Sequence, residues 1–185
     1  MIAAYRWILS RGVNPSKTVF AGDSAGGDLV ALSLLYIRDH APDLPMPSCA
    51  VLQSPWLDWT GYKTTGSPNW HSDFMLEYDT STPIMNQMIR PEGTEADTPE
   101  ISALLVESVR GLPPQLVMYS STEILVSDSE RWIERCRKEG GDVVGFVLRG
   151  ELHTFAVGSP VCGREVERKS DEVFLRYAFK QASRT

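Results

Sequence analysis

A chain of 185 residues with 42% hydrophobic and 23% charged residues can bury a core as one globular domain, and its composition is neither disordered nor fibrous. Its 24 Asp and Glu outnumber its 18 Lys and Arg, giving a net charge of −6 without a basic stripe, so no nucleic-acid partner is expected. No apolar run approaches the roughly 20 residues that cross a bilayer, so no membrane span is expected. The first residues lack the succession of basic, apolar and small-residue regions that a signal peptide has, so secretion is not expected.

The first predicted strand and helix flank the hexapeptide GDSAGG at residues 22–27. An apolar run over residues 17–22 predicts the strand, and residues 25–38 predict the helix. This helix is apolar on nearly every face, which is typical of a helix buried inside a larger body.

Three later runs, residues 48–53, 115–120 and 143–148, predict further strands. They are continuously apolar, which is typical of a parallel sheet covered on both faces. A helix is predicted over residues 128–139, opened by capping-box spacing from Ser127 to Glu130, and a last helix over residues 165–181. The fold class is therefore α/β, a parallel sheet flanked by helices.

Residues 55–112 differ from the rest in being rich in aromatic, Met, Pro and polar residues. The stretch is too long for a simple connection, so residues 56–102 are interpreted as a cap or lid inserted into one domain spanning residues 1–185. A packed helical insertion that binds no ligand is the alternative. Apolar lining favours an apolar acyl group, and the side chains expected to contact the substrate are Trp56, Phe74, Met75 and Phe155.

Ser24 in GDSAGG fits two kinds of serine hydrolase. Trypsin-like proteases carry a similar GDSGG, but they are all-β and place His and Asp before the serine, whereas only 23 residues precede Ser24 and a helix follows it. Strand, turn and helix instead predict a nucleophile elbow, in which Gly22, Ala25, Gly26 and Gly27 let the backbone pass.

A serine nucleophile needs a general base, and in α/β-hydrolases the histidine comes last, after the acid. Of the three histidines, His40 ends the helix after the elbow and His71 lies in the insertion. His153 follows the last predicted strand, so it is the candidate base.

The acid should follow the strand at residues 115–120, where Glu123, Asp128 and Glu130 are candidates. Asp128 and Glu130 belong to the start of the next helix, where carboxylates cap and complement the helix dipole. Glu123 lies nearest the strand end and is favoured, with Asp128 as the alternative.

Five landmarks in order resemble the hormone-sensitive-lipase-like family of α/β-hydrolase esterases: GDSAGG at 22–27, SPWLD at 54–58, GLPP at 111–114, EILVSD at 123–128 and GELH at 150–153. The resemblance implies a partial α/β-hydrolase fold with a helical cap insertion. It also implies Ser24 as nucleophile, His153 as base, and Glu123 as acid in a slot more often filled by Asp. The implied activity is hydrolysis of small to medium carboxylic esters through an acyl-enzyme.

The resemblance covers these residues but only the C-terminal part of the family's usual length. The backbone N–H of Ala25 is expected as one oxyanion donor, whereas the family's HGGG-type segment, which supplies others, is not among the 185 residues. Losing one donor typically costs about 100- to 1,000-fold in turnover, so these residues alone should be impaired. The strand at residues 17–22 would also be an unpaired sheet edge, and homo-oligomers through this edge are expected.

Two alternatives to an esterase remain open. The family includes receptors that kept the fold after losing part of the triad, so a non-catalytic ligand-binding or degenerate paralogue is one of them. Retention of three triad candidates argues against it, and the missing HGGG argues for it. A serine peptidase of the same fold is the other.

No metal or nucleotide cofactor is expected, because HExxH, CxxC and P-loop patterns are absent from the sequence. The three cysteines, Cys49, Cys136 and Cys162, are an odd number at irregular spacing. They are expected to be buried free thiols, and the reducing cytoplasm is the expected compartment.

Overall fold

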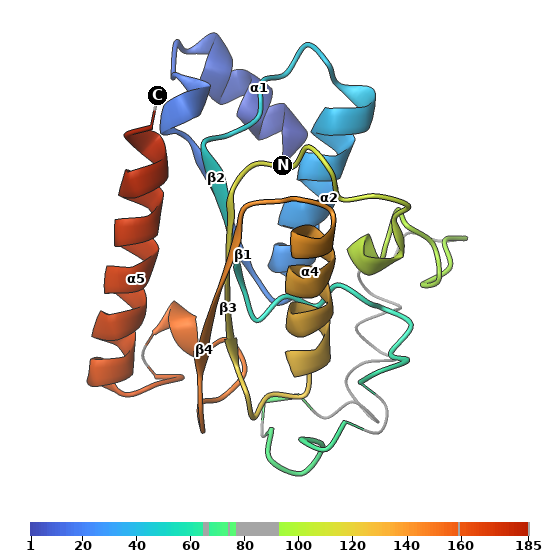
Figure 1. Ribbon diagram of the computed structural model, residues 1–185, viewed down its shortest axis with the longest axis vertical. Helices are drawn as coiled ribbons and strands as arrows, with labels where there is room; N and C mark the ends of the chain where they lie inside the picture. The colour runs from blue at the N-terminus through green and yellow to red at the C-terminus, as the bar shows by residue number, and fades with distance from the viewer. Residues whose placement is uncertain (65–66, 74, 77–92, 159, 185) are drawn as a thin grey trace.

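The computed structural model describes residues 1–64, 67–73, 75–76, 93–158 and 160–184 (Figure 1). The described strands are β1 (Val19–Asp23), β2 (Cys49–Gln53), β3 (Gln115–Ser120) and β4 (Val143–Leu148). They form one parallel sheet in the order β1-β2-β3-β4. The predicted α/β class with a parallel sheet is therefore confirmed.

The described helices form layers on the two sides of this sheet. They are α1 (Ile2–Ser10), α2 (Ala25–His40), α4 (Val126–Lys138) and α5 (Arg164–Ala182). Figure 1 shows α5 on one side of the sheet and α2 and α4 on the other. Because every strand runs in the same direction, the carboxyl ends of all four strands meet at one edge of the sheet.

Successive residues of the central strands face opposite cores, which explains their continuous apolar runs. In β2, Ala50 and Leu52 pack towards α2 and α4, whereas Cys49 and Val51 pack towards α5. Full burial of one such aliphatic side chain stabilises the fold by about 1.5 to 3 kcal/mol. The two cores together make the sheet a fixed platform for the loops at its edge.

Burial differs from the sequence-based expectation at the margins of the sheet. Helix α2 is not buried on every face, since Leu29 is 50% and Tyr36 47% exposed. In the outer strand β4, Val144 and Val147 are 44% and 47% exposed, so the sheet is not covered there on both faces. β4 is the last strand of the described sheet, so its two exposed valines lie at the margin of the described fold.

The sequence-based prediction gave the wrong cap for helix α4 and missed helix α1. Helix α4 begins at Val126 without a side-chain cap, so the capping box from Ser127 to Glu130 is wrong. Asp128 is 0% exposed, and its carboxylate turns inward and accepts the backbone N–H groups of Leu57 and Asp58. Helix α1 was not predicted, and it is held by Tyr5, whose ring packs edge-on against Phe20 at 4.8 Å between centroids.

The described parts of the insertion at residues 56–102 run through turns and bends without a helix. Residues 77–92 lie outside the described residues, so a helical cap stays a prediction. Cys49 and Cys136 are buried free thiols as expected, whereas Cys162 is half-buried and also free. Among the described helices, none combines the length and apolar character needed to cross a membrane.

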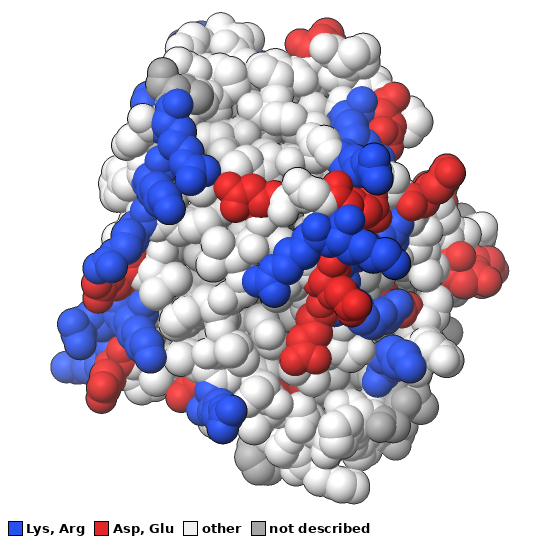
Figure 2. All heavy atoms as spheres, viewed as in Figure 1, with Lys and Arg blue, Asp and Glu red and all other residues white. Residues whose placement is uncertain are grey.

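Figure 2 shows Lys and Arg side chains lying among Asp and Glu side chains over α4. Ion pairs such as Arg135 with Glu139, 3.1 Å apart, account for part of this mixing. The visible face thus carries both signs of charge close together.

Candidate active site

Ser24 lies at a sharp turn between β1 and α2. Its φ and ψ angles are 51° and −121°, a conformation that costs a non-glycine residue about 1 to 3 kcal/mol. The turn is held by hydrogen bonds on both sides: the Ser24 N–H donates to Gln53 O at 2.9 Å, and the Trp56 N–H donates to Ser24 O at 3.0 Å. The strained residue is therefore fixed by the adjoining end of β2.

Two glycines of the hexapeptide are required by close backbone approach. A Cβ on Gly22 would lie 2.2 Å from the carbonyl oxygen of Gly26, and one on Gly27 would lie 2.7 Å from Cβ of Pro55. A Cβ on Gly26 would meet no heavy atom within 4 Å. Glycine is thus needed at Gly22 and Gly27 to form the turn, but not at Gly26.

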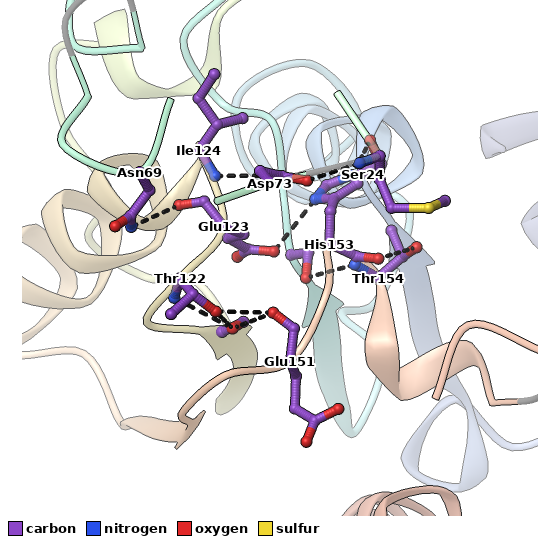
Figure 3. A network of polar contacts seen from close by, with 12 residues as sticks. Ser24, Asn69, Asp73, Thr122, Glu123, Ile124, Glu151, His153 and Thr154 are labelled. Atoms are coloured by element: carbon purple, nitrogen blue, oxygen red, sulfur yellow. Dashed lines mark hydrogen bonds and ion pairs between the residues drawn. The ribbon is translucent and has the colours of Figure 1, made fainter. Parts of the chain in front are cut away.

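The structure brings the three predicted triad residues together at the carboxyl ends of the strands (Figure 3). His153 Nε2 lies 3.0 Å from Ser24 Oγ, and His153 Nδ1 lies 3.2 Å from Glu123 Oε2. Ser24 follows β1, Glu123 follows β3 and His153 follows β4. A hydroxyl, an imidazole and a carboxylate in this series can move a proton from the serine to the imidazole.

Glu123 is 0% exposed, and this burial raises the pKa of its carboxyl group, while contacts with His153 and Ser54 lower it. Its Oε1 atom has no hydrogen-bond partner among the described residues. The imidazole of His153 is therefore the main group able to compensate a buried negative charge on Glu123. Such a carboxylate favours the charged imidazolium in return.

Asp128, the alternative acid, is engaged elsewhere. Its Oδ2 accepts the backbone N–H groups of Leu57 and Asp58, each at 2.9 Å. Burial raises the pKa of Asp128 to about 7, although these two hydrogen bonds lower it. The described contacts therefore place Glu123, and not Asp128, against His153.

Asp28 and Ser54 are buried polar residues near the site that sequence reasoning missed. Asp28 accepts the indole N–H of Trp59 at 3.1 Å and the backbone N–H of Ala103 at 3.2 Å. Ser54 has a φ of 45°, and its hydroxyl accepts the N–H of Thr154 at 3.1 Å. An Asp inside an apolar helix was a signal for Asp28, and the SPWLD landmark at residues 54–58 begins with Ser54.

Ala25, the predicted oxyanion donor, is the first residue of α2. Backbone N–H groups of the first helical turn have no acceptor within their own helix, so this N–H can serve an oxyanion beside Ser24.

The residues predicted to contact the substrate differ in their exposure. Phe155 is 0% exposed and packs into the core on the α5 side. Trp56 is 3% exposed and stacks on Trp59 at 4.1 Å between centroids. Because neighbouring side chains cover Phe155 and Trp56, their burial does not support contact with a substrate. Met75 is 47% exposed, so its side chain is accessible. Phe74 lies outside the described residues.

In the described ranges, no group of three or more His, Cys, Asp or Glu side chains is arranged to hold a metal ion.

The buried carboxyls predict how stability depends on pH. Burial raises the pKa of Asp28 from 3.8 to about 8, so its contribution to the free energy of unfolding is complete below pH 4 and is lost as the pH rises towards 8. Urea denaturation at pH 5 and pH 8 should show a larger loss of stability in the unmodified chain than in Asp28→Asn, which cannot titrate. An equal loss in both proteins would contradict the prediction.

Comparison with known proteins agrees with this architecture. The family described as alpha/beta hydrolase fold matches residues 1–157. An esterase of Acinetobacter venetianus is 33% identical over 134 residues, 72% of this chain and 43% of the relative. An acetyl-hydrolase of Streptomyces hygroscopicus is 30% identical over 145 residues, 78% of this chain and 46% of the relative.

A solved esterase from the bacterial hormone-sensitive lipase family superposes with a TM-score of 0.86 at 28% identity, covering 98% of this chain and 59% of the solved one. The chain spans about half the length of the curated relatives it matches. With this match in sequence and structure, the chain belongs to the α/β-hydrolase fold family and resembles its hormone-sensitive-lipase-like esterases.

Proposed function

We propose that this chain carries the catalytic centre of a serine carboxylester hydrolase acting on small to medium carboxylic esters. The observation that carries the proposal is the series in which His153 lies 3.0 Å from Ser24 Oγ and 3.2 Å from the Glu123 carboxylate. Relatives named esterase and acetyl-hydrolase support ester hydrolysis as the reaction class.

In the proposed reaction, Ser24 Oγ attacks the ester carbonyl carbon while His153 Nε2 takes the hydroxyl proton. Glu123 stabilises the resulting imidazolium, and the Ala25 N–H donates to the oxyanion. His153 then returns its proton to the departing alkoxide, which leaves as the alcohol. Water activated by His153 attacks the acyl-enzyme and releases the carboxylic acid and the free serine.

An apolar hollow bordering the elbow supports an uncharged substrate. It has a volume of about 370 Å³. Its lining is mainly apolar and includes Ala25, Leu29, Leu32, Trp59 and Ile101, together with Asp28 and Glu100. Volumes of this order accommodate small organic ligands. With Ala25 as the single assigned oxyanion donor, turnover by these residues alone is expected to be lower than that of an esterase with several donors.

Covalent labelling tests the proposal directly. The chain is incubated with an alkyl fluorophosphonate, and peptide mass spectrometry is expected to find the phosphonyl group on Ser24. Ser24→Ala should lose this label and the hydrolysis of p-nitrophenyl butyrate. An unlabelled Ser24 would favour the non-catalytic alternative, and cleavage of a peptide p-nitroanilide in preference to the aryl ester would favour a peptidase.

We further propose that the chain self-associates through β1, which pairs only with β2 among the described strands. An unpaired edge presents free backbone donors and acceptors to a second strand. Sedimentation velocity should detect a dimer or larger oligomer, and a monodisperse monomer would count against this proposal.

A cytoplasmic location is proposed from the three free thiols, which a reducing compartment preserves. Fractionation of the source cells should recover the protein with cytoplasmic markers, and recovery outside the cell would overturn the assignment.

A further inference from the structure

The loop that carries Glu123 is hydrogen-bonded to a distant part of the chain. The acid loop is defined here as residues 121–124, and the anchor segment as residues 67–73 of the insertion. Asn69 Nδ2 donates to the carbonyl oxygens of Ser121 at 2.9 Å and Glu123 at 3.0 Å. Figure 3 shows Asn69 beside Glu123, on the side of the loop away from Ser24.

The same anchor segment binds the other two peptides of the acid loop. Ser72 Oγ lies 3.0 Å from the carbonyl oxygen of Thr122. The Ile124 N–H donates to Asp73 Oδ2 at 2.8 Å, and Asp73 is 6% exposed. All four residues of the acid loop are thus bound through their backbone to the anchor segment.

The anchor segment has internal hydrogen bonds that hold its own shape. The Trp70 N–H donates to Ser67 O at 3.1 Å, and the Asp73 N–H donates to Asn69 O at 3.2 Å. Trp70 also packs against the apolar cluster that contains the buried side chains of Ile124 and Leu125. The anchor segment therefore meets the acid loop as an ordered, partly apolar surface.

On its other side, the acid loop is tied to the loop that carries His153. The Ser120 and Thr122 hydroxyls donate to the carbonyl oxygen of Glu151 at 2.7 Å and 2.9 Å. These bonds fix the base loop to the end of β3. They leave the anchor segment as the support of the acid loop from the insertion side.

We propose that Asn69, Ser72 and Asp73 are positioning residues for Glu123, so that the insertion sets the geometry of the triad as well as covering it. This inference rests on the proposed role of Glu123. The Glu123 carboxylate contacts His153 through Oε2, while its Oε1 has no described hydrogen-bond partner. Its position therefore depends on the loop backbone, and a displacement of about 1 Å is enough to reduce catalysis about 100-fold.

Nuclear magnetic resonance of the full 185-residue chain tests the inference without relying on turnover. A His153 Nδ1–H that donates to a carboxylate gives a strongly deshielded proton signal, because the hydrogen bond draws electron density away from the proton. The same bond keeps the proton on Nδ1. Asn69→Ala is expected to lose or shift this signal upfield. Thr98→Ala removes another hydroxyl of the insertion, one that donates to Glu95 O, and should leave the signal unchanged.

Kinetics give the second readout. Asn69→Ala is expected to lower kcat for p-nitrophenyl butyrate about 10- to 100-fold, with KM changed less than about twofold. Ser72 is exposed, so Ser72→Ala should fold normally and show a smaller loss of kcat that Ser72→Thr restores. Thermal unfolding of each variant separates misplacement of the loop from loss of the fold.

The outcomes distinguish the two proposals. An unchanged His153 signal and kcat in folded Asn69→Ala and Ser72→Ala would overturn the positioning role. If the unmodified chain neither labels at Ser24 nor hydrolyses ester, yet the His153 signal is lost in Asn69→Ala, the proposed function fails and the positioning role stands.

Discussion

His153→Ala is expected to reduce kcat for p-nitrophenyl butyrate by about 10⁴- to 10⁶-fold relative to the unmodified chain, with little change in KM. In the proposed reaction the imidazole accepts the Ser24 proton and later donates it to the leaving group, so its removal should affect both acylation and deacylation. Nε2 lies 3.0 Å from Ser24 Oγ, and no other histidine is hydrogen-bonded to this serine in the described chain. Steady-state kinetics with matched protein concentrations measure the effect.

The two candidate acids provide a matched comparison for the same assay. Glu123→Gln should lower kcat by about 10⁴-fold, because an amide does not hold the productive tautomer of His153. Asp128→Asn should act mainly on stability, since Asp128 binds the backbone of Leu57 and Asp58. A larger loss of kcat in Asp128→Asn than in Glu123→Gln would reverse the assignment of the acid.

Gly22→Ala is expected to lower the free energy of unfolding by at least about 3 kcal/mol, or to prevent folding. The added Cβ would lie 2.2 Å from the carbonyl oxygen of Gly26, which belongs to the backbone of α2 and not to a flexible side chain. Relief of this contact requires β1 and α2 to separate at the turn that holds Ser24. Chemical denaturation followed by circular dichroism measures the change.

Gly26→Ala is the control for this experiment. Its Cβ would have no heavy atom within 4 Å, and alanine favours a helix over glycine by about 1 kcal/mol. The variant should be as stable as the unmodified chain or slightly more stable. A loss of stability equal to that of Gly22→Ala would show that the close approach at Gly22 is not the cause.

Much of the fold could be predicted because it depends on local pattern. Continuous apolar runs indicated strands buried on both faces, and β2, β3 and β4 lie where those runs occur. Helix α1 could not be predicted in this way. Its attachment depends on contacts with distant residues: the Tyr5 ring packs on Phe20, the Tyr5 hydroxyl donates to Pro45 O, and Arg6 pairs with Asp43.

In the candidate site, too, some features could be predicted from the sequence and others depend on distant contacts. Ser24, Glu123 and His153 were predicted from their order along the chain, and they follow β1, β3 and β4, whose carboxyl ends lie at one edge of the parallel sheet. Asp128 was expected to cap its helix, but its carboxylate binds the N–H groups of Leu57 and Asp58. Local spacing could not show this, because the partners lie about 70 residues away.

The sequence by itself determined the parallel α/β class, the strand, turn and helix around Ser24, and the chain order of the three triad candidates. These properties follow from the apolar runs, the small residues around Ser24 and the order of the elements along the chain, all of which can be read without knowing which distant residues are in contact. Only the tertiary structure decided that Asn69 and Asp73 bind the loop of Glu123. Each of these bonds joins a side chain to a backbone group about 50 residues away. Backbone carbonyls and N–H groups are the same in every residue type, so no sequence pattern predicts which of them a side chain binds.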